Sequence, residues 1–158
     1  MPVYVKYGDI VGNVTAEGHT EWVDVSSCQW GVGRGIGSPT GRSANREASA
    51  PSISEVVVTK EMDKSSYRWL EQALQGEGVE CTIHFCKTDA GKLETYAEYK
   101  LSNCLVSGYS VSSGGDRPTE SISINFTKIE FLFTEMGIQN ATADTPRVFY
   151  DIAKAVKG

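Results

Sequence analysis

The sequence predicts a mainly β protein, a two-sheet antiparallel β-barrel or β-sandwich with one flanking α-helix. Three observations support this fold class. About seven short segments are rich in β-branched and aromatic residues, and most alternate apolar with polar side chains. One segment in the body of the chain has the periodicity of a helix instead. Glycine, proline and serine separate the segments, as expected for strands joined by turns.

The first two strands are expected over residues 1–7 and 22–32. In the second, Val23 and Val25 stand at odd positions, but the next apolar residues stand at even ones: Cys28, Trp30 and Val32. Since side chains along a strand point alternately to opposite faces, this change of phase predicts a bulge near Ser26 and Ser27.

A long polar loop is expected over residues 38–52. Its roughly 15 residues exceed the usual connection, and loops of that length tend to be functional or disordered. Before it, glycine occupies every second position from Gly31 to Gly37. Alternate glycines predict a strand with one flat face that another surface can approach closely.

The next strand and the helix follow each other directly. A continuous β-branched run from Ile53 to Thr59 predicts a strand covered on both faces. For the helix, Asp63 or Ser65 is the expected cap and Gly76 the expected terminator. Its predicted apolar stripe consists of Trp69, Leu70, Ala73 and Leu74.

Four further strands are expected over residues 79–86, 94–101, 104–112 and 120–133. The last is the clearest. Its first apolar residues stand at even positions, namely Ile122, Ile124 and Phe126. The apolar residues after them stand at odd positions, namely Ile129, Phe131 and Phe133. A bulge near Thr127 and Lys128 would bring both sets onto one core. In the tail, Val148, Phe149, Ile152 and Val156 predict a short helix or strand.

Composition and charge exclude several classes of function. The 158 residues suit one domain that needs neither disulfide nor metal to fold. Because the net charge is −5, nucleic-acid binding and adhesion to anionic membranes are disfavoured. No apolar run approaches the roughly 18–20 residues of a membrane span. The amino terminus lacks the features of a cleavable signal peptide, so we expect synthesis in the cytoplasm and export, if any, by another route.

No metal site is predicted, although Cys81, His84 and Cys86 lie close together in the sequence. In a regular strand the two cysteines point to opposite faces, and only His84 and Cys86 share a side. Zinc requires four converging ligands. The four cysteines of the chain are therefore expected to be free, mostly buried thiols.

No cofactor site or catalytic residue is predicted either. The glycines at 31–37 do not have the spacing of a dinucleotide fingerprint or a phosphate loop. The two histidines, His19 and His84, are not accompanied by a nucleophile elbow. Glu94 and Glu98 are best interpreted as a solvated strand face.

Trp22 and Trp30 allow two interpretations. They share a parity, but the expected bulge would place them on opposite faces. Core packing is the simpler interpretation for each. A subunit interface is the alternative, because such interfaces are enriched in aromatic residues.

A set of short motifs in a fixed order resembles a known family. They are Tyr7-Gly8-Asp9-Ile10-Val11-Gly12, His19, Trp22-Val23-Asp24-Val25, Gln29-Trp30-Gly31, Thr59-Lys60-Glu61-Met62-Asp63-Lys64-Ser65-Ser66, Val106-Ser107-Gly108-Tyr109-Ser110 and Pro118-Thr119-Glu120-Ser121 with the strand after it. Together they resemble the Hcp (haemolysin-coregulated protein) family, the tube proteins of bacterial type VI secretion systems. The resemblance covers residues 3–133, and the motifs at 59–66 and 118–121 are its most specific parts. The chain departs from many members at Tyr67, where they have proline, and at Asn13-Val14, where they have Glu-Ser.

The resemblance implies a barrel of the phage tail-tube type within a single domain over residues 1–158, with its core over 3–133 and an extension over 134–158. It also implies homohexameric rings that stack into a hollow tube. A contractile sheath would expel this tube with a spike-tip protein, and effector proteins would travel in its lumen. The product would reach the extracellular space or a target cell. No enzyme activity is expected, because the residues after Phe133 are too few for a fused toxin domain.

Subunit contacts are expected at Trp30 and in the polar loop, where charged and amide side chains suit a wet interface: Arg42, Asn45, Arg46 and Glu47. A mobile surface loop is the alternative for these four residues. Two other functions stay open at this point. One is a tail-tube subunit of a phage or another contractile particle, and the other is a monomeric binding module or small enzyme that shares the barrel.

Overall fold

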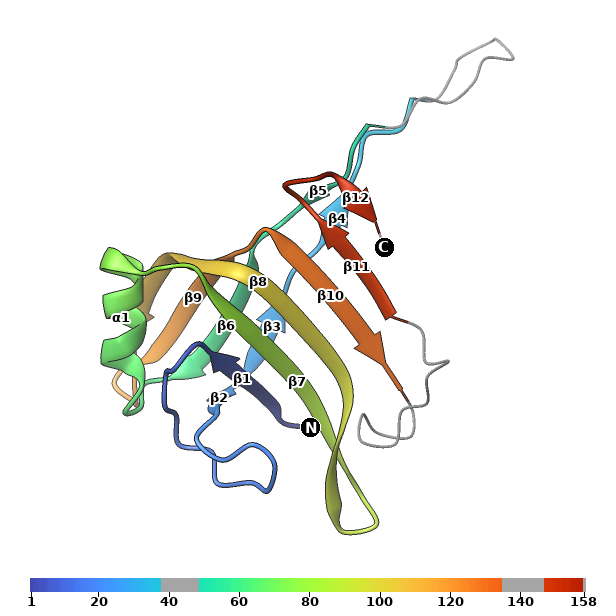
Figure 1. The fold of residues 1–158 in the computed structure, drawn as a ribbon. Helices are drawn as coiled ribbons and strands as arrows, with labels where there is room; N and C mark the ends of the chain where they lie inside the picture. Colours follow the sequence, from blue (N-terminus) through green and yellow to red (C-terminus); the bar gives the residue numbers. More distant parts are fainter. Residues whose placement is uncertain (38–48, 135–146, 158) are drawn as a thin grey trace.

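Two antiparallel sheets, joined by one long strand, form the body of the protein in a computed structural model (Figure 1). The structure describes residues 1–37, 49–134 and 147–157. The long strand is β8 (Lys92–Ser112), which pairs with β7 and β10 through its first part and with β9 through its second. The predicted fold class, mainly β with one helix beside two antiparallel sheets, is confirmed.

The first sheet has the strand order β12-β11-β10-β8-β7-β1-β2. Apart from β8, its members are β1 (Val3–Tyr7), β2 (Val23–Val25), β7 (Val79–Asp89), β10 (Lys128–Phe133), β11 (Arg147–Asp151) and β12 (Val156–Lys157). The tail residues predicted as helix or strand thus supply the strand β11, which pairs with β10.

The second sheet has the order β3-β6-β9-β8, with β3 (Ser27–Gln29), β6 (Val56–Glu61) and β9 (Thr119–Asn125). Two short strands, β4 (Val32–Gly33) and β5 (Ser52–Ile53), form a separate ladder that extends away from the barrel (Figure 1). The predicted continuous strand over 53–59 is therefore wrong in one respect, because Ile53 belongs to this ladder and β6 begins at Val56.

Both predicted bulges are in fact points where the chain changes sheets. Val25 ends β2 in the first sheet, and Ser27 begins β3 in the second, while the Ser26 amide donates to the Thr59 carbonyl at 2.7 Å. Likewise β9 ends at Asn125 in the second sheet and β10 begins at Lys128 in the first. The inner faces of the two sheets look toward each other, so a chain that crosses between them must change the parity of its buried residues.

The core fills the space between the sheets with buried side chains from both: Val5, Val23, Val56, Val58, Ile83, Leu101, Ile122, Ile124, Phe126 and Ile129. Three of the four cysteines are buried and all four are free thiols, as predicted. Phe133 does not join this core. It lies at the end of β10 and is 46% exposed.

The helix α1 (Ser66–Gln75) covers the barrel beside β8, but its buried stripe is narrower than predicted. Trp69 is fully buried and packs against Tyr7 with ring centroids 5.0 Å apart, and Ala73 is half-buried. Leu70 and Leu74 were predicted in the same stripe and are instead exposed. They lie one position beyond Trp69 and Ala73, and the barrel covers only the side of α1 that carries those two residues.

The helix ends are also built differently from the prediction. Ser65 is the N-cap residue, but its side chain does not cap the helix. Instead, Asp63 accepts hydrogen bonds from the Ser65 amide at 2.8 Å and from its hydroxyl at 2.5 Å. Gly76 ends the helix in an extended conformation, and a Cβ there would lie 2.6 Å from the Gln72 carbonyl oxygen. Close approach, rather than a left-handed backbone, therefore requires this glycine.

Candidate assembly surfaces

The second sheet has backbone edges without a strand partner on two sides. Among the described strands, β3 pairs only with β6, and the Leu105–Ser112 part of β8 pairs only with β9. These edges are separated by β6 and β9. An unpaired edge presents free N–H and C=O groups, which makes it a template for pairing with another chain.

A buried ion pair fixes α1 to this sheet. The Lys60 ammonium on β6 lies 2.6 Å from a carboxylate oxygen of Glu120 on β9, and both side chains are completely buried. Lys60 also lies 3.0 Å from Asp63, while the Ser66 hydroxyl donates to Glu120 at 2.7 Å and Tyr109 donates to its other oxygen. Every member is paired, as a buried charge requires.

This network joins the two most specific motifs of the sequence, at 59–66 and 118–121. Sequence reasoning recognised the motifs without finding that Lys60 and Glu120 meet. One lysine and one glutamate stand in strands that are otherwise apolar on the same face. Because charged side chains are rarely buried unless they are paired, this pattern could have indicated that the two residues meet.

Trp30 lies between the core and an apolar groove. It is half-buried and contacts Tyr99 edge to face, with ring centroids 5.4 Å apart. The groove has a volume of about 210 Å³ and is lined by Trp30, Val32, Pro51, Ile53, Ile129, Phe131, Val148, Phe149, Tyr150 and Lys157. The packing interpretation of Trp30 thus describes one side of its ring, while the other side lines a groove on the surface.

The β4–β5 ladder beside this groove carries the alternate glycines. A Cβ added to Gly31 or Gly33 would have no described atom within 4 Å. The flat face predicted from the glycines is therefore uncovered at these two positions, whereas a Cβ on Gly35 would lie 3.3 Å from the Ser49 hydroxyl oxygen. The other predicted interface residues, Arg42, Asn45, Arg46 and Glu47, lie outside the described residues.

The two histidines, predicted without functional neighbours, lie together in a buried cluster. His19, in the loop before β2, has its Nε2 atom 2.9 Å from Nδ1 of His84 on β7. His84 Nε2 in turn lies 2.6 Å from a carboxylate oxygen of Glu98 on β8. Glu98 is therefore buried and paired, and its interpretation as a solvated residue is wrong. When neutral His84 donates to Glu98 from Nε2, its Nδ1 accepts from His19.

The environment of this cluster shifts several pKa values. The hydrogen bond from His84 lowers the pKa of Glu98 against the opposing effect of burial. Burial, followed by the proximity of His84, lowers the pKa of His19. The Cys86 thiol lies 3.8 Å from His19 Nε2, but burial raises its pKa, which favours the unreactive thiol form.

Cys81 and Cys86 lie in different surroundings. Cys81 belongs to the main core, whereas Cys86 lies beyond an irregularity in the β7–β8 pairing and contacts His19. Within residues 1–37, 49–134 and 147–157, no three His, Cys, Asp or Glu side chains are placed to hold a metal ion.

The fold and these surfaces define a small antiparallel β-barrel protein with unpaired sheet edges and an apolar groove on its surface. A sequence model for the family described as "Type VI secretion system effector, Hcp" matches residues 4–133. The chain belongs to this family, and it is thus a tube or effector protein of a type VI secretion system.

Solved structures support the assignment at the level of the fold. A structure described as a type six secretion system protein has a TM-score of 0.86 and 24% sequence identity, with 99% of each chain covered. Hcp1 from Salmonella typhimurium has a TM-score of 0.76 and 14% identity, covering 99% of this chain and 98% of its own. Hcp3 from Pseudomonas aeruginosa, described as a secreted protein, has a TM-score of 0.62 and 21% identity, covering 95% and 99%.

No curated protein sequence matches the chain. Proteins of the Hcp family are secreted components of type VI secretion systems. Among the described residues, no helix has the length and apolar character needed to cross a membrane.

Proposed function

We propose that this chain forms homohexameric rings that stack into the hollow tube of a type VI secretion system. A contractile sheath expels the tube together with a spike-tip protein, and the lumen carries effector proteins. The number of subunits and these partners come from the family resemblance. The family match favours a secretion system over the tail tube of a phage.

The two unpaired edges of the second sheet are the observation that carries this proposal. If β3 of one copy pairs with the Leu105–Ser112 edge of the next, the sheet continues from subunit to subunit. Such a contact joins two different patches, and a heterologous contact closes into a ring when its rotation is suitable. Ring formation also covers two edges that would otherwise promote aggregation.

We propose the polar loop with Arg42, Asn45, Arg46 and Glu47 as a further surface, for contacts between neighbours in a ring or between stacked rings. Deletion of residues 42–47 should leave a folded subunit but weaken rings or stacks. Normal tubes from this deletion variant would contradict the role of the loop.

The mass in solution tests the ring. Light scattering at several protein concentrations should give about 103 kDa, the mass of six copies of the 17.2 kDa chain. A stable 17.2 kDa monomer at high concentration would contradict the proposal and favour a monomeric binding module.

A further inference from the structure

The outward side of α1 carries an exposed apolar ridge. Tyr67, Leu70 and Leu74 are 69%, 45% and 76% exposed, respectively. Their spacing of three and four residues places them on one face of the helix. The barrel already covers the opposite side, where Trp69 is buried. Contiguous apolar side chains on a surface indicate an interaction site.

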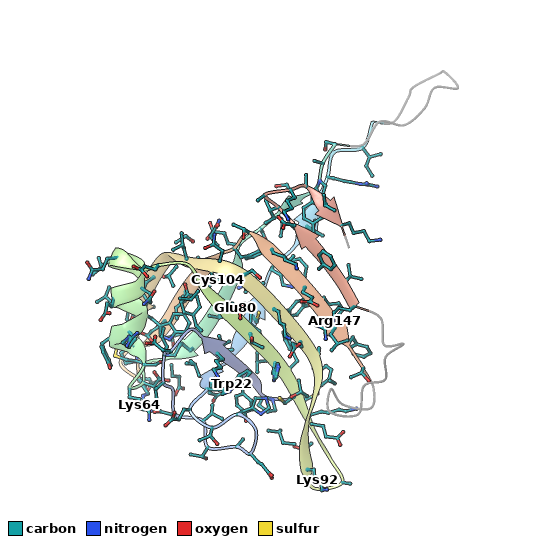
Figure 2. The ribbon with its side chains drawn as sticks, viewed as in Figure 1. Trp22, Lys64, Glu80, Lys92, Cys104 and Arg147 are labelled. Carbon is teal, nitrogen blue, oxygen red and sulfur yellow. The ribbon has the colours of Figure 1, made fainter. Side chains whose placement is uncertain are left out.

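The apolar groove beside Trp30 lies on the other side of the molecule. Val32 and Val148 line it and are about half exposed, and so is Val156 in strand β12, next to the lining residue Lys157. In Figure 1, α1 lies at the left, whereas β4, β11 and β12 lie at the upper right. Figure 2 shows the same separation for two labelled side chains, Lys64 just before α1 and Arg147 at the start of β11. The ridge therefore cannot fill the groove of its own chain.

We propose that the ridge of one copy docks into the groove of the next copy around the ring. This inference rests on the proposed ring and names a second contact within it. The ridge belongs to the helix that packs beside β8, and the groove begins at Trp30, directly after β3. Pairing of the β8 edge with β3 of the next copy therefore brings the ridge toward the groove. The two contacts follow one another along one interface.

Charge supports the same pairing. Glu71 is exposed and lies one helical turn after Tyr67, at the flank of the ridge. Lys157 lines the groove and is exposed as well. A carboxylate at the flank of the ridge and an ammonium at the groove are complementary, and complementary charges fix the register of an interface.

The sharpest test uses two variants that each lose one half of the contact. Leu74→Asp places a charge on the ridge, and Val148→Asp places one in the groove; both positions are exposed, so the fold should be retained. Each variant alone should lose the ring mass and give 17.2 kDa by light scattering, with an unchanged melting temperature. Val11→Asp is the matched control, because Val11 is exposed outside both surfaces, and it should still form rings.

Mixing the two monomeric variants tests complementarity directly. The intact ridge of the Val148→Asp chain fits the intact groove of the Leu74→Asp chain. The surfaces that remain free in this pair are the altered groove of the first chain and the altered ridge of the second, so neither can bind a third copy. The mixture should therefore give a dimer of about 34 kDa at high concentration, with no larger species. No dimer in the mixture, or rings from either single variant, would overturn the ridge-to-groove contact.

The outcome also separates this inference from the ring itself. Rings from the wild-type chain together with rings from Leu74→Asp would overturn the ridge contact but keep the proposed function, and would leave the ridge for a different partner. A monomeric wild-type chain would overturn both.

A charge exchange refines the test. Glu71→Lys should weaken each contact by about two- to fivefold, the usual strength of an exposed ion pair. Addition of Lys157→Glu in the same chain should restore ring stability at low salt. Failure of the double variant to recover, with rings otherwise intact, would overturn the pairing of these two residues.

Discussion

Two buried polar clusters hold the barrel together in different ways. In one, Lys60 and Glu120 form a fully buried ion pair between β6 and β9 that also holds the start of α1. In the other, His19, His84 and Glu98 connect the loop before β2 to strands β7 and β8. The first joins opposite charges that are fully buried, whereas the second contains His19, whose pKa is lowered by burial. The histidine cluster is therefore the one that we expect to lose stability on acidification.

The largest expected effect comes from breaking the ion pair. Glu120→Ala leaves the Lys60 ammonium buried without its closest partner, and loss of one member of a buried pair costs about 3–5 kcal/mol of unfolding free energy. Urea unfolding of the variant should show this loss. A decrease below about 1 kcal/mol would mean that Lys60 reaches water or another anion when Glu120 is absent.

Replacement of both charges is the matched control. In the double variant Lys60→Met with Glu120→Leu, no charge remains without a partner, so most of the lost stability should return. The same urea experiment measures it. A double variant as unstable as Glu120→Ala would show that shape, rather than the unpaired charge, causes the loss.

Acidification should weaken the histidine cluster. The pKa of His19 is lowered in the folded chain, so its stabilising effect is present above the ordinary histidine value of about 6.5 and is lost as pH falls toward the folded pKa. The lowered pKa of Glu98 extends the loss to lower pH, below about 4.3. Melting temperatures between pH 8 and pH 5 should therefore decrease, and His19→Gln should flatten this dependence above pH 5.

The ion-pair cluster supplies the control for this experiment. Glu120→Ala should lower the melting temperature at every pH and keep the dependence between pH 8 and pH 5. An unchanged pH dependence in His19→Gln would contradict the role of His19.

The smallest effect is expected at the edge of the histidine cluster. The Thr95 hydroxyl lies 3.4 Å from His19 Nε2 and 3.5 Å from the Cys86 sulfur. Thr95→Val keeps the shape and removes these weak contacts, so unfolding should become easier by about 1 kcal/mol. Thermal unfolding at pH 7 measures the change, and a loss as large as that of Glu120→Ala would show that both clusters are equally rigid.

The sequence predicted most strands because their residues alternate, but it assigned two features to the wrong cause. The phase changes at Ser26 and at Thr127 were visible, and they mark changes of sheet rather than bulges. A pattern along one chain cannot distinguish the two, since both alter which parity is buried. The stripe of α1 was too wide because apolar character at Leu70 and Leu74 was interpreted as burial, whereas these residues face outward.

The candidate surfaces were less accessible to sequence reasoning. Trp30 was singled out from its residue type. Its position at a groove does not decide between the two interpretations of this residue, a subunit interface and core packing. The pairing of His19 with His84 could not be found, because His19 lies in a loop and no periodicity places a loop residue against a strand 65 positions away. Lys60 and Glu120 are similarly distant, although each stands in a strand.

The long strand β8 has a mechanical consequence. Because one continuous backbone runs through both sheets, the sheets cannot be pulled apart without extending covalent bonds or shearing the hydrogen-bond ladders on either side of β8. Ladders loaded in shear share the force among many bonds at once instead of opening one by one. A displacement of one sheet is therefore passed directly to the other through β8.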